Sequence, residues 1–325
     1  MGYTKSQLPI PFESSWIQNV HLNLSSIEEI AAKLSGKGEV SGWNEVQWAL
    51  MALRLTDLTT LAGDDSASNV QRLCLQAAYP FSTKLMQHFE EESANKVHTA
   101  AVCVYPSRVK DAYEKLGRLN KLNEINIAAV ATGFPSGQYP LQTRLAEIAS
   151  AIENGATEID VVVDRNLVLL NKWEELYAEL VEMRKVCGET VHLKTILAIG
   201  ECGSMENVYK ASMIAMMAGS DFIKTSTGKE SVNATLPVGL VMIWAIMDFK
   251  ERTGRKIGLK PAGGVRSVKD AIAWLHLIKN TLGDEWITPE LFRFGASGLV
   301  DNIEKHLEGQ FYKNVNVGVK VSITQ

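Results

Sequence analysis

Two lysines and one aspartate occupy strand positions from which their side chains are expected to converge. Lys224, Lys260 and Asp160 each belong to a short apolar run typical of a parallel β-strand. Side chains alternate between the two faces of a strand, so Lys224 points away from the side taken by Ile223, and Lys260 away from that of Leu259. An isolated lysine would extend to the rim of a sheet. Two lysines and a carboxylate in one interior are costly to bury and suit amine catalysis.

The chemistry of such a cluster follows from the pKa of lysine. A free lysine titrates near 10.4, so only about 0.04% is neutral at pH 7. A second ammonium about 6 Å away, at an effective dielectric constant near 20, would lower that pKa by about two units. Desolvation acts in the same direction. A neutral Lys224 amine could then attack a carbonyl and form an iminium, with Asp160 carrying protons.

Three glycine-containing loops follow neighbouring strands and indicate a phosphate site. Glycine lets backbone N–H groups approach an anion, and each loop leads into the N-terminus of an expected helix. A phosphate site after the last two strands is common in (β/α)8 barrels. The candidate residues are Thr227, Gly228 and Lys229 after the sixth strand, Gly263, Gly264, Val265 and Arg266 after the seventh, and Gly295 and Ser297 after the eighth.

The elements that must hold these residues alternate along the chain. Eight apolar, β-branched runs are separated by eight amphipathic stretches of helical length, which predicts an α/β fold of the (β/α)8 TIM-barrel type. An open doubly wound sheet is the alternative, but no GxGxxG motif follows the first run. The expected strands are Leu53–Leu61, Thr99–Tyr105, Ile125–Thr132, Glu158–Val163, Leu193–Ile199, Phe222–Thr227, Ile257–Pro261 and Leu291–Gly295.

The ends of the chain differ from this pattern. Residues 1–50 contain a capped helix start at Ser25 and no clear strand signal, so we expect an N-terminal helical extension. The barrel is expected at residues 51–308, and residues 309–325 form a polar C-terminal tail.

Composition narrows the class of protein. The net charge is −4, and no long basic stripe appears, which argues against a nucleic-acid partner. The four cysteines show neither CxxC pairing nor histidines at ligand spacing, so we expect no metal site and a reduced, cytoplasmic setting. No apolar run has the roughly 20 residues that span a bilayer, and no secretory signal is evident. We therefore expect no membrane association, while a homo-oligomer is compatible with the sequence.

Six ordered motifs between Leu53 and Leu299 resemble the deoxyribose-phosphate aldolase family. The resemblance extends in particular to its longer, eukaryotic-type members, which also carry an N-terminal extension. The motifs are Lys224–Lys229, Lys260–Arg266, Glu158–Val162, Asp57–Leu61, Val102–Pro106 and Thr132–Gly137.

The resemblance implies a class I aldolase that reversibly cleaves 2-deoxy-D-ribose 5-phosphate to acetaldehyde and D-glyceraldehyde 3-phosphate. It implies Lys224 as the Schiff-base lysine, Lys260 as the neighbour that perturbs it, and Asp160 as proton donor and acceptor. It also implies that Asp57 and Cys103 line the pocket near the reacting carbons. The partners would be a small phosphosugar and acetaldehyde. No cofactor would be needed, since the lysine supplies the electron sink.

Two departures from the family pattern concern the phosphate loop and the tail. Family members commonly carry a second Ser or Thr where Gly298 follows Ser297, so one hydroxyl donor is lost. Some bacterial members use a C-terminal tyrosine in proton transfer, whereas this chain ends in Gln325, and Tyr312 is its nearest tail tyrosine.

Several alternatives stay open at the level of sequence. Lys194 either points inward as a third lysine or reaches the rim, and Arg266 either orients the phosphate loop or caps its helix. A transaldolase or another Schiff-base lyase would share the reactive lysine but differ in substrate. A barrel that binds a sugar phosphate without turnover would form no covalent adduct.

Overall fold

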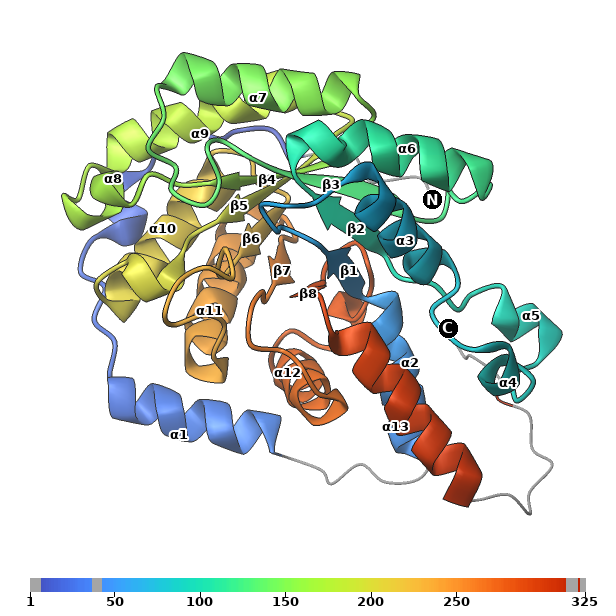
Figure 1. Ribbon diagram of the computed structural model, residues 1–325. Helices are drawn as coiled ribbons and strands as arrows, with labels where there is room; N and C mark the ends of the chain where they lie inside the picture. Colours follow the sequence, from blue (N-terminus) through green and yellow to red (C-terminus); the bar gives the residue numbers. More distant parts are fainter. Residues whose placement is uncertain (1–6, 37–42, 314–320, 322–325) are drawn as a thin grey trace.

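Eight parallel strands form a nearly closed barrel in the computed structural model, which describes residues 7–36, 43–313 and 321 (Figure 1). Each strand pairs with its neighbour in the order β7-β6-β5-β4-β3-β2-β1-β8. The strands are β1 Thr56–Thr59, β2 Ala101–Val104, β3 Asn126–Ala131, β4 Glu158–Val162, β5 His192–Ile196, β6 Phe222–Lys224, β7 Gly258–Lys260 and β8 Phe294–Ala296.

The barrel closes between β7 and β8. Parallel bridges join Leu259 to Phe292 and Ala262 to Gly295. The Arg293 N–H donates to the Leu259 carbonyl at 3.1 Å, and the Gly295 N–H to the Pro261 carbonyl at 2.9 Å. These bonds bring the loops after β7 and β8 together at one edge of the barrel mouth.

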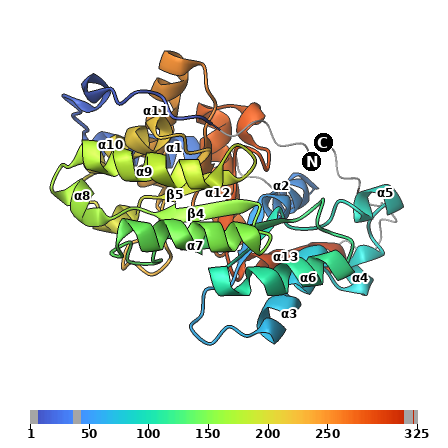
Figure 2. The ribbon, with the colours of Figure 1, turned by 90° about the horizontal axis from the view of Figure 1, so that it is seen from above.

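Helices surround the strands on the outside, as the view from above shows (Figure 2). Most of them follow the strand-to-helix alternation expected from the sequence. The helices after β1 are α3 Ala67–Ala78, α4 Thr83–Met86, α5 Glu91–Ala94, α6 Val109–Arg118, α7 Leu141–Glu153, α8 Arg165–Leu169, α9 Trp173–Cys187, α10 Met205–Met217, α11 Leu236–Thr253, α12 Val268–Thr281 and α13 Leu299–Lys313.

Side-chain caps explain where several of these helices begin. The hydroxyls of Ser66, Ser204 and Thr235 accept N–H groups from the first turns of α3, α10 and α11. Ser267 and Asp270 form a capping box at the start of α12. Each cap ends a loop at the barrel mouth and thereby fixes where that loop meets its helix.

The (β/α)8 prediction is confirmed, although each observed strand is shorter than the predicted run, as the first and last strands illustrate. The first strand begins at Thr56 rather than Leu53, because helix α2, Trp43–Arg54, includes the first two residues that we assigned to the strand. The last strand begins at Phe294 rather than Leu291. Short apolar runs fit both helix and strand, so their boundaries are decided by packing.

The residues before β1 pack on the outside of the barrel. Helix α1, Leu24–Ser35, lies along α11 and α12, and α2 lies against α12 and α13 (Figure 1). The preceding segment crosses α9 and α10, where the Ile10 N–H donates to the Met217 carbonyl at 2.9 Å and the Tyr177 hydroxyl donates to the Ile10 carbonyl at 2.6 Å.

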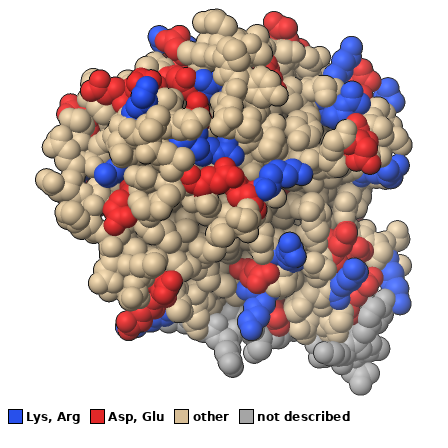
Figure 3. Space-filling model, turned by 60° about the vertical axis from the view of Figure 1, so that its left-hand side comes forward, with Lys and Arg blue, Asp and Glu red and all other residues tan. Residues whose placement is uncertain are grey.

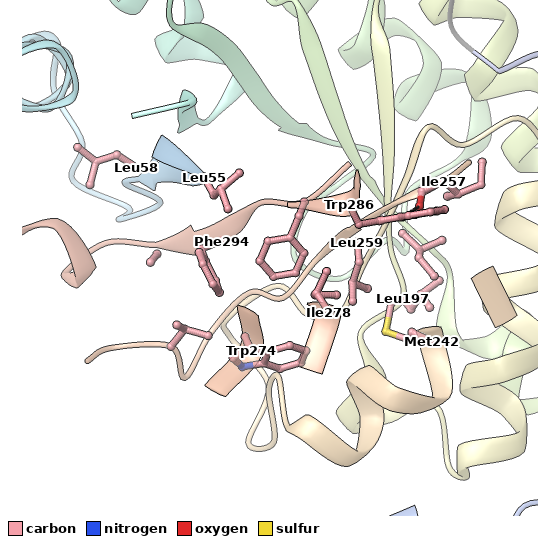
Figure 4. Close-up of a cluster of buried hydrophobic side chains, with 14 of the residues drawn as sticks. Leu55, Leu58, Leu197, Met242, Ile257, Leu259, Trp274, Ile278, Trp286 and Phe294 are labelled. Carbon is pink, nitrogen blue, oxygen red and sulfur yellow. Dashed lines mark hydrogen bonds between the residues drawn. The ribbon is translucent and has the colours of Figure 1, made fainter. Parts of the chain in front are cut away.

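Apolar side chains fill the space between the strands and the outer helices. Figure 4 shows Trp286 and Leu259 from the β7–β8 side packed toward Trp274 and Ile278 of α12. The indole N–H of Trp286 donates to the Ile257 carbonyl at 3.0 Å, which satisfies its polar atom inside the core.

Val321 pairs with the chain on the amino-terminal side of the barrel. The Val321 N–H donates to the His88 carbonyl at 2.7 Å, and the Glu90 N–H donates to the Val321 carbonyl at 3.1 Å. His88 and Glu90 lie in the segment that leads from α3 into the start of β2. This contact directs Val321 away from the carboxyl ends of the strands. The side chain of Tyr312 and residue Gln325 lie outside the described residues.

The outer surface carries both signs of charge. On the face drawn in Figure 3, acidic and basic side chains are interspersed. None of the helices in the described ranges is long and apolar enough to cross a membrane.

We expect Asp221→Ala to lower the free energy of unfolding by about 3–5 kcal/mol, because it leaves the buried Arg184 guanidinium without its carboxylate. One Asp221 oxygen accepts from Arg184 at 2.8 Å, and the other accepts the Gln7 N–H at 2.7 Å. Urea denaturation monitored by circular dichroism measures the change. In the matched control Asp284→Ala, the exposed pair with Lys279 is lost and the change should stay below about 1 kcal/mol. Equal effects of the two substitutions would contradict this account.

Candidate active site

One buried carboxylate lies at the centre of a cluster of three lysines inside the barrel. The Oδ2 atom of Asp160 lies 2.7 Å from the Nζ of Lys224 and 2.7 Å from the Nζ of Lys260. Its Oδ1 atom lies 2.9 Å from the Nζ of Lys194. All four side chains are buried, so water screens their charges weakly.

Strand register explains how residues distant in sequence meet at this carboxylate. Lys224 pairs with Lys260 between β6 and β7, and Asp160 pairs with Lys194 between β4 and β5. Lys224 pairs with Ile196, which follows Lys194 by two residues on β5. Because every second residue of a strand points to the same side, Lys194 and Lys224 occupy successive inward levels of the barrel. The structure therefore places all these side chains in the lumen, as the alternation predicted for Lys224, Lys260 and Asp160, and it shows that Lys194, whose orientation was open, points inward as well.

A second layer of charges lies toward the amino-terminal ends of the strands. Arg293 donates to Asp57 Oδ1 at 2.6 Å and to Glu158 Oε1 at 2.8 Å. The other oxygen of Asp57 lies 2.5 Å from the Nζ of Lys260, and the other oxygen of Glu158 accepts from Lys194. Asp57, Glu158 and Arg293 are all fully buried.

The cluster holds three carboxylates and four basic side chains. Lys194, Lys260 and Arg293 already balance Asp57, Glu158 and Asp160, so a protonated Lys224 leaves one net positive charge in the interior. Burial, and the neighbouring Lys260 ammonium, lower the pKa of Lys224 below its ordinary value, although Asp160 opposes them. Lys224 is thus the member of the cluster most readily made neutral.

The neighbours of Lys224 respond in the opposite direction. Desolvation disfavours the charged form of Lys260, but the carboxylates of Asp160 and Asp57 outweigh it and raise the pKa of Lys260. The three lysines hold the pKa of Asp160 well below its usual range despite its burial. Lys260 therefore stays an ammonium and Asp160 a carboxylate beside the Lys224 amine.

Lys224 opens into a cavity of about 270 Å³ at the carboxyl ends of the strands. Its walls come from β1 and from the loops after β6, β7 and β8, which bring the predicted phosphate residues together with the amine. The lining residues are Thr59, Leu61, Lys224, Thr227, Gly228, Lys229, Asn233, Ala262, Gly263, Gly264, Val265, Arg266, Gly295, Ala296, Ser297 and Gly298.

Backbone N–H groups on two of these loops are available to an anion. Within the described residues, the N–H groups of Gly264, Val265 and Ser297 donate to no protein acceptor. Ser297 also stands at the N-terminal end of the 15-residue helix α13, where the helix dipole favours negative charge. An added Cβ at Gly298 would meet nothing within 4 Å, so the missing side chain there leaves open space.

The loop after β6 differs from the expectation. We predicted that Thr227 and Gly228 offer their N–H groups to phosphate, but both donate to the Glu230 carboxylate, at 3.0 and 3.1 Å. The Lys229 N–H donates to the Thr227 hydroxyl at 3.0 Å. The Glu230 carboxylate thus accepts the hydrogen bonds that an anion would otherwise accept in this turn. From this loop, the exposed side chain of Lys229 lines the cavity and can contact an anion there.

Two other predicted pocket residues lie below or beside the cavity rather than on its wall. Asp57 has both oxygens directed to cations, so its role is electrostatic, and it does not line the pocket as the resemblance implied. Cys103 is buried in an apolar group with Phe134 and Ile196, and burial raises the pKa of its thiol.

The N–H of Arg266 donates to Asp270, while Ser267 caps α12, so capping is not the role of the Arg266 side chain.

Sequence reasoning missed Arg293, Glu158 and Asn233. Arg293 and Glu158 stand at inward positions of expected strands, so the alternation that found Lys224 could have found them. Asn233 lines the cavity and donates to the Glu230 carbonyl at 2.8 Å, a contact with no sequence signal. Among the described residues, no three His, Cys, Asp or Glu side chains are grouped so as to hold a metal ion.

Comparisons with known proteins agree with this geometry. A family model described as DeoC/LacD family aldolase matches residues 51–284. The chain is 54% identical to the deoxyribose-phosphate aldolases of Mus musculus and Homo sapiens, over 91% of this chain and 93% of each relative. It is 38% identical to that of Agrobacterium fabrum, over 80% of this chain and 92% of the relative.

A solved structure supports the fold. The deoxyribose phosphate aldolase of Aeropyrum pernix, described as having a unique tetrameric structure, superposes with a TM-score of 0.58 at 22% identity. The similarity covers 85% of this chain and all of that one.

The native protein should be resistant to thiol reagents at pH 8. All four cysteines are free and buried, and burial raises the pKa of Cys74, Cys187 and Cys202 to about 12 and that of Cys103 above its usual value. Because the thiolate is the reactive form, we expect no alkylation by iodoacetamide in the folded protein and four labels after denaturation. Intact-protein mass spectrometry counts the labels. Rapid labelling of Cys103 in the folded protein would refute this view of the lumen.

Proposed function

Because the chain belongs to the DeoC/LacD family of aldolases, we propose that it reversibly cleaves 2-deoxy-D-ribose 5-phosphate to acetaldehyde and D-glyceraldehyde 3-phosphate. The mechanism is of the class I type, with Lys224 as the amine that forms the Schiff base. The observation that carries the proposal is the position of Lys224: burial lowers its pKa, and it opens into a cavity that is also lined by unbonded backbone N–H groups.

The first step is attack of the Lys224 Nζ on the C1 carbonyl of the open-chain sugar. The carbinolamine then loses water and becomes an iminium. This loss requires a proton for the departing hydroxyl, and the ammonium of Lys260 lies on the same Asp160 oxygen as Lys224. Lys260 and Asp160 together can therefore supply and recover protons next to the reacting nitrogen.

The iminium next draws electrons from the C2–C3 bond. The C3 hydroxyl loses its proton, the C2–C3 bond breaks, and its electron pair forms an enamine on Lys224 while glyceraldehyde 3-phosphate departs. Protonation of the enamine at C2 and hydrolysis release acetaldehyde. We assign the proton transfers to Asp160, whose low pKa keeps it a carboxylate between steps, so that it passes each proton on to a neighbouring amine.

The substrate phosphate is proposed to bind at the loops after β7 and β8. The support is the set of N–H groups of Gly264, Val265 and Ser297, with the exposed side chains of Lys229 and Arg266 on the same cavity. Backbone donors bind a phosphate without adding a further buried charge. We also propose that this reaction serves deoxyribose breakdown. We propose a cytoplasmic location, because the four cysteines are free, as is usual in a reducing compartment.

Borohydride reduction in the presence of acetaldehyde should leave a stable adduct on Lys224, because reduction fixes the iminium as a secondary amine. Peptide mass mapping locates the adduct. Lys224→Ala should give none, whereas the matched control Lys250→Ala removes a half-buried lysine on the outer helix α11 and should be labelled as the wild type. An adduct on Lys260 or Lys194 would keep the aldolase class and overturn this assignment. No adduct in the folded wild-type protein would favour a sugar-phosphate-binding barrel without turnover.

Gly263→Ala should lower kcat/KM for 2-deoxyribose 5-phosphate about 10- to 100-fold, the value of one lost charged hydrogen bond. Gly263 has φ +75°, and an added Cβ would lie 2.8 Å from Asn233, so the phosphate loop must shift. Gly254→Ala is the control, because it has nearly the same φ of +73° but open space around it. Steady-state kinetics of both variants measure the effect, and trapping with acetaldehyde, which has no phosphate, should be unchanged. Equal losses in both variants would mean that strain alone is responsible.

A further inference from the structure

Arg293 is a fully buried cation of the barrel, and it stands outside the cavity. Its side chain is fully buried, and its guanidinium donates to Asp57, to Glu158 and to the Pro289 carbonyl. The ring of Phe222 lies 5.9 Å from the guanidinium carbon. Arg293 therefore cannot touch a substrate bound above Lys224, yet it is built into the same network.

Both carboxylates held by Arg293 also hold lysines of the upper layer. Asp57 uses its second oxygen for Lys260, and Glu158 uses its second oxygen for Lys194. Lys260 and Lys194 in turn bind the two different oxygens of Asp160. Two chains of ion pairs thus lead from the single guanidinium to the carboxylate that accepts from Lys224.

We infer that Arg293, paired with Glu158, is a positioning residue for the aldolase reaction: it fixes the two carboxylates that orient Lys260 and Lys194 on Asp160 and sets the charge balance around Lys224. The inference rests on the proposed function, because it concerns the protonation of the proposed Schiff-base amine.

The direction of the effect follows from the charge count. If Arg293 loses its charge, the cluster becomes more negative, protonated Lys224 is favoured, and less neutral amine is present at a given pH. If Glu158 loses its charge, the cluster becomes more positive, and more neutral amine is present. Removing both charges restores the balance. A purely structural role would give loss of stability in every variant and no opposite shifts.

The groups that face this network come from five strands. His192 is kept neutral by burial, which lowers its pKa, and burial likewise keeps Cys103 a thiol. The titratable and charged groups around Lys224 are Asp160 on β4, Lys260 on β7 and Cys103 on β2, and those around Arg293 are Asp57 on β1, Glu158 on β4, and His192 and Lys194 on β5.

The test measures the rate of borohydride-trapped adduct formation with acetaldehyde from pH 5 to 10, in the full-length protein. Arg293→Gln should move the acid limb of the rate profile to higher pH, and Glu158→Gln should move it to lower pH. At an assumed separation of about 10 Å and an effective dielectric constant near 20, each shift is about one pH unit. The double variant should return close to the wild-type profile.

Two control variants separate positioning from folding. Arg184→Gln removes another buried arginine, whose Asp221 partner lies 2.8 Å away at the start of β6, and it should lower stability without moving the profile. Arg293→Lys keeps the charge but loses the two-armed geometry, so it should keep the wild-type pH limb with a lower kcat. If Arg293→Gln fails to fold, Arg293→Lys and Glu158→Gln still carry the test.

The outcomes distinguish this inference from the proposed function. Opposite shifts, restored in the double variant, with an unchanged KM for the phosphosugar, support the positioning role. A profile unmoved in Glu158→Gln and in Arg293→Gln, or moved equally in Arg184→Gln, overturns it while leaving the aldolase proposal intact. Absence of any adduct in the wild-type protein would instead remove the proposed function on which the inference rests.

Discussion

The Asp160 carboxylate, shared by three buried lysines, is the interaction on which the rest of the site depends. Burying one ammonium without a partner is prohibitive, and burying three beside a single carboxylate is worse. A second layer of charges offsets this cost, because Asp57 and Glu158 add negative charge next to the lysines and Arg293 pairs with both of these carboxylates. What is left over is the charge on Lys224, and that excess favours a neutral amine in the interior of a folded protein.

This arrangement divides the barrel into levels with different tasks. The amino-terminal level holds Arg293 and its carboxylates, the middle level holds the lysines, and the carboxyl-terminal level is the open cavity. Closure between β7 and β8 joins the levels, because Arg293 enters the lumen there and the loops proposed to bind phosphate leave it there. The proposed anion site uses backbone N–H groups, so it adds no further ammonium to an interior that already has one in excess.

Local sequence patterns were sufficient to predict the barrel and the orientation of three side chains in its interior. Period-two alternation gave the inward orientation of Lys224, Lys260 and Asp160, and alternating runs gave the barrel, because both depend on neighbours in the chain. The same alternation applies to Arg293 and Glu158 and would have predicted that both point inward. It could not have predicted their pairing, because the sequence of one strand does not show which residue of another strand its side chains contact. The role of Glu230 was missed because a turn that contains glycine can satisfy its N–H groups either with a ligand or with a side chain two or three residues away.

The sequence by itself thus determined the fold class, the order of the elements, and the inward face that carries Lys224, Lys260 and Asp160. These properties arise from the periods of strand and helix and from turn chemistry, which act over a few residues. The tertiary structure alone decided which charges pair, which cation stays unbalanced, and which N–H groups remain available to an anion. Those properties depend on strand register, burial and loop closure, which bring together residues more than a hundred positions apart, as in the contacts of Arg293 with Asp57 and Glu158.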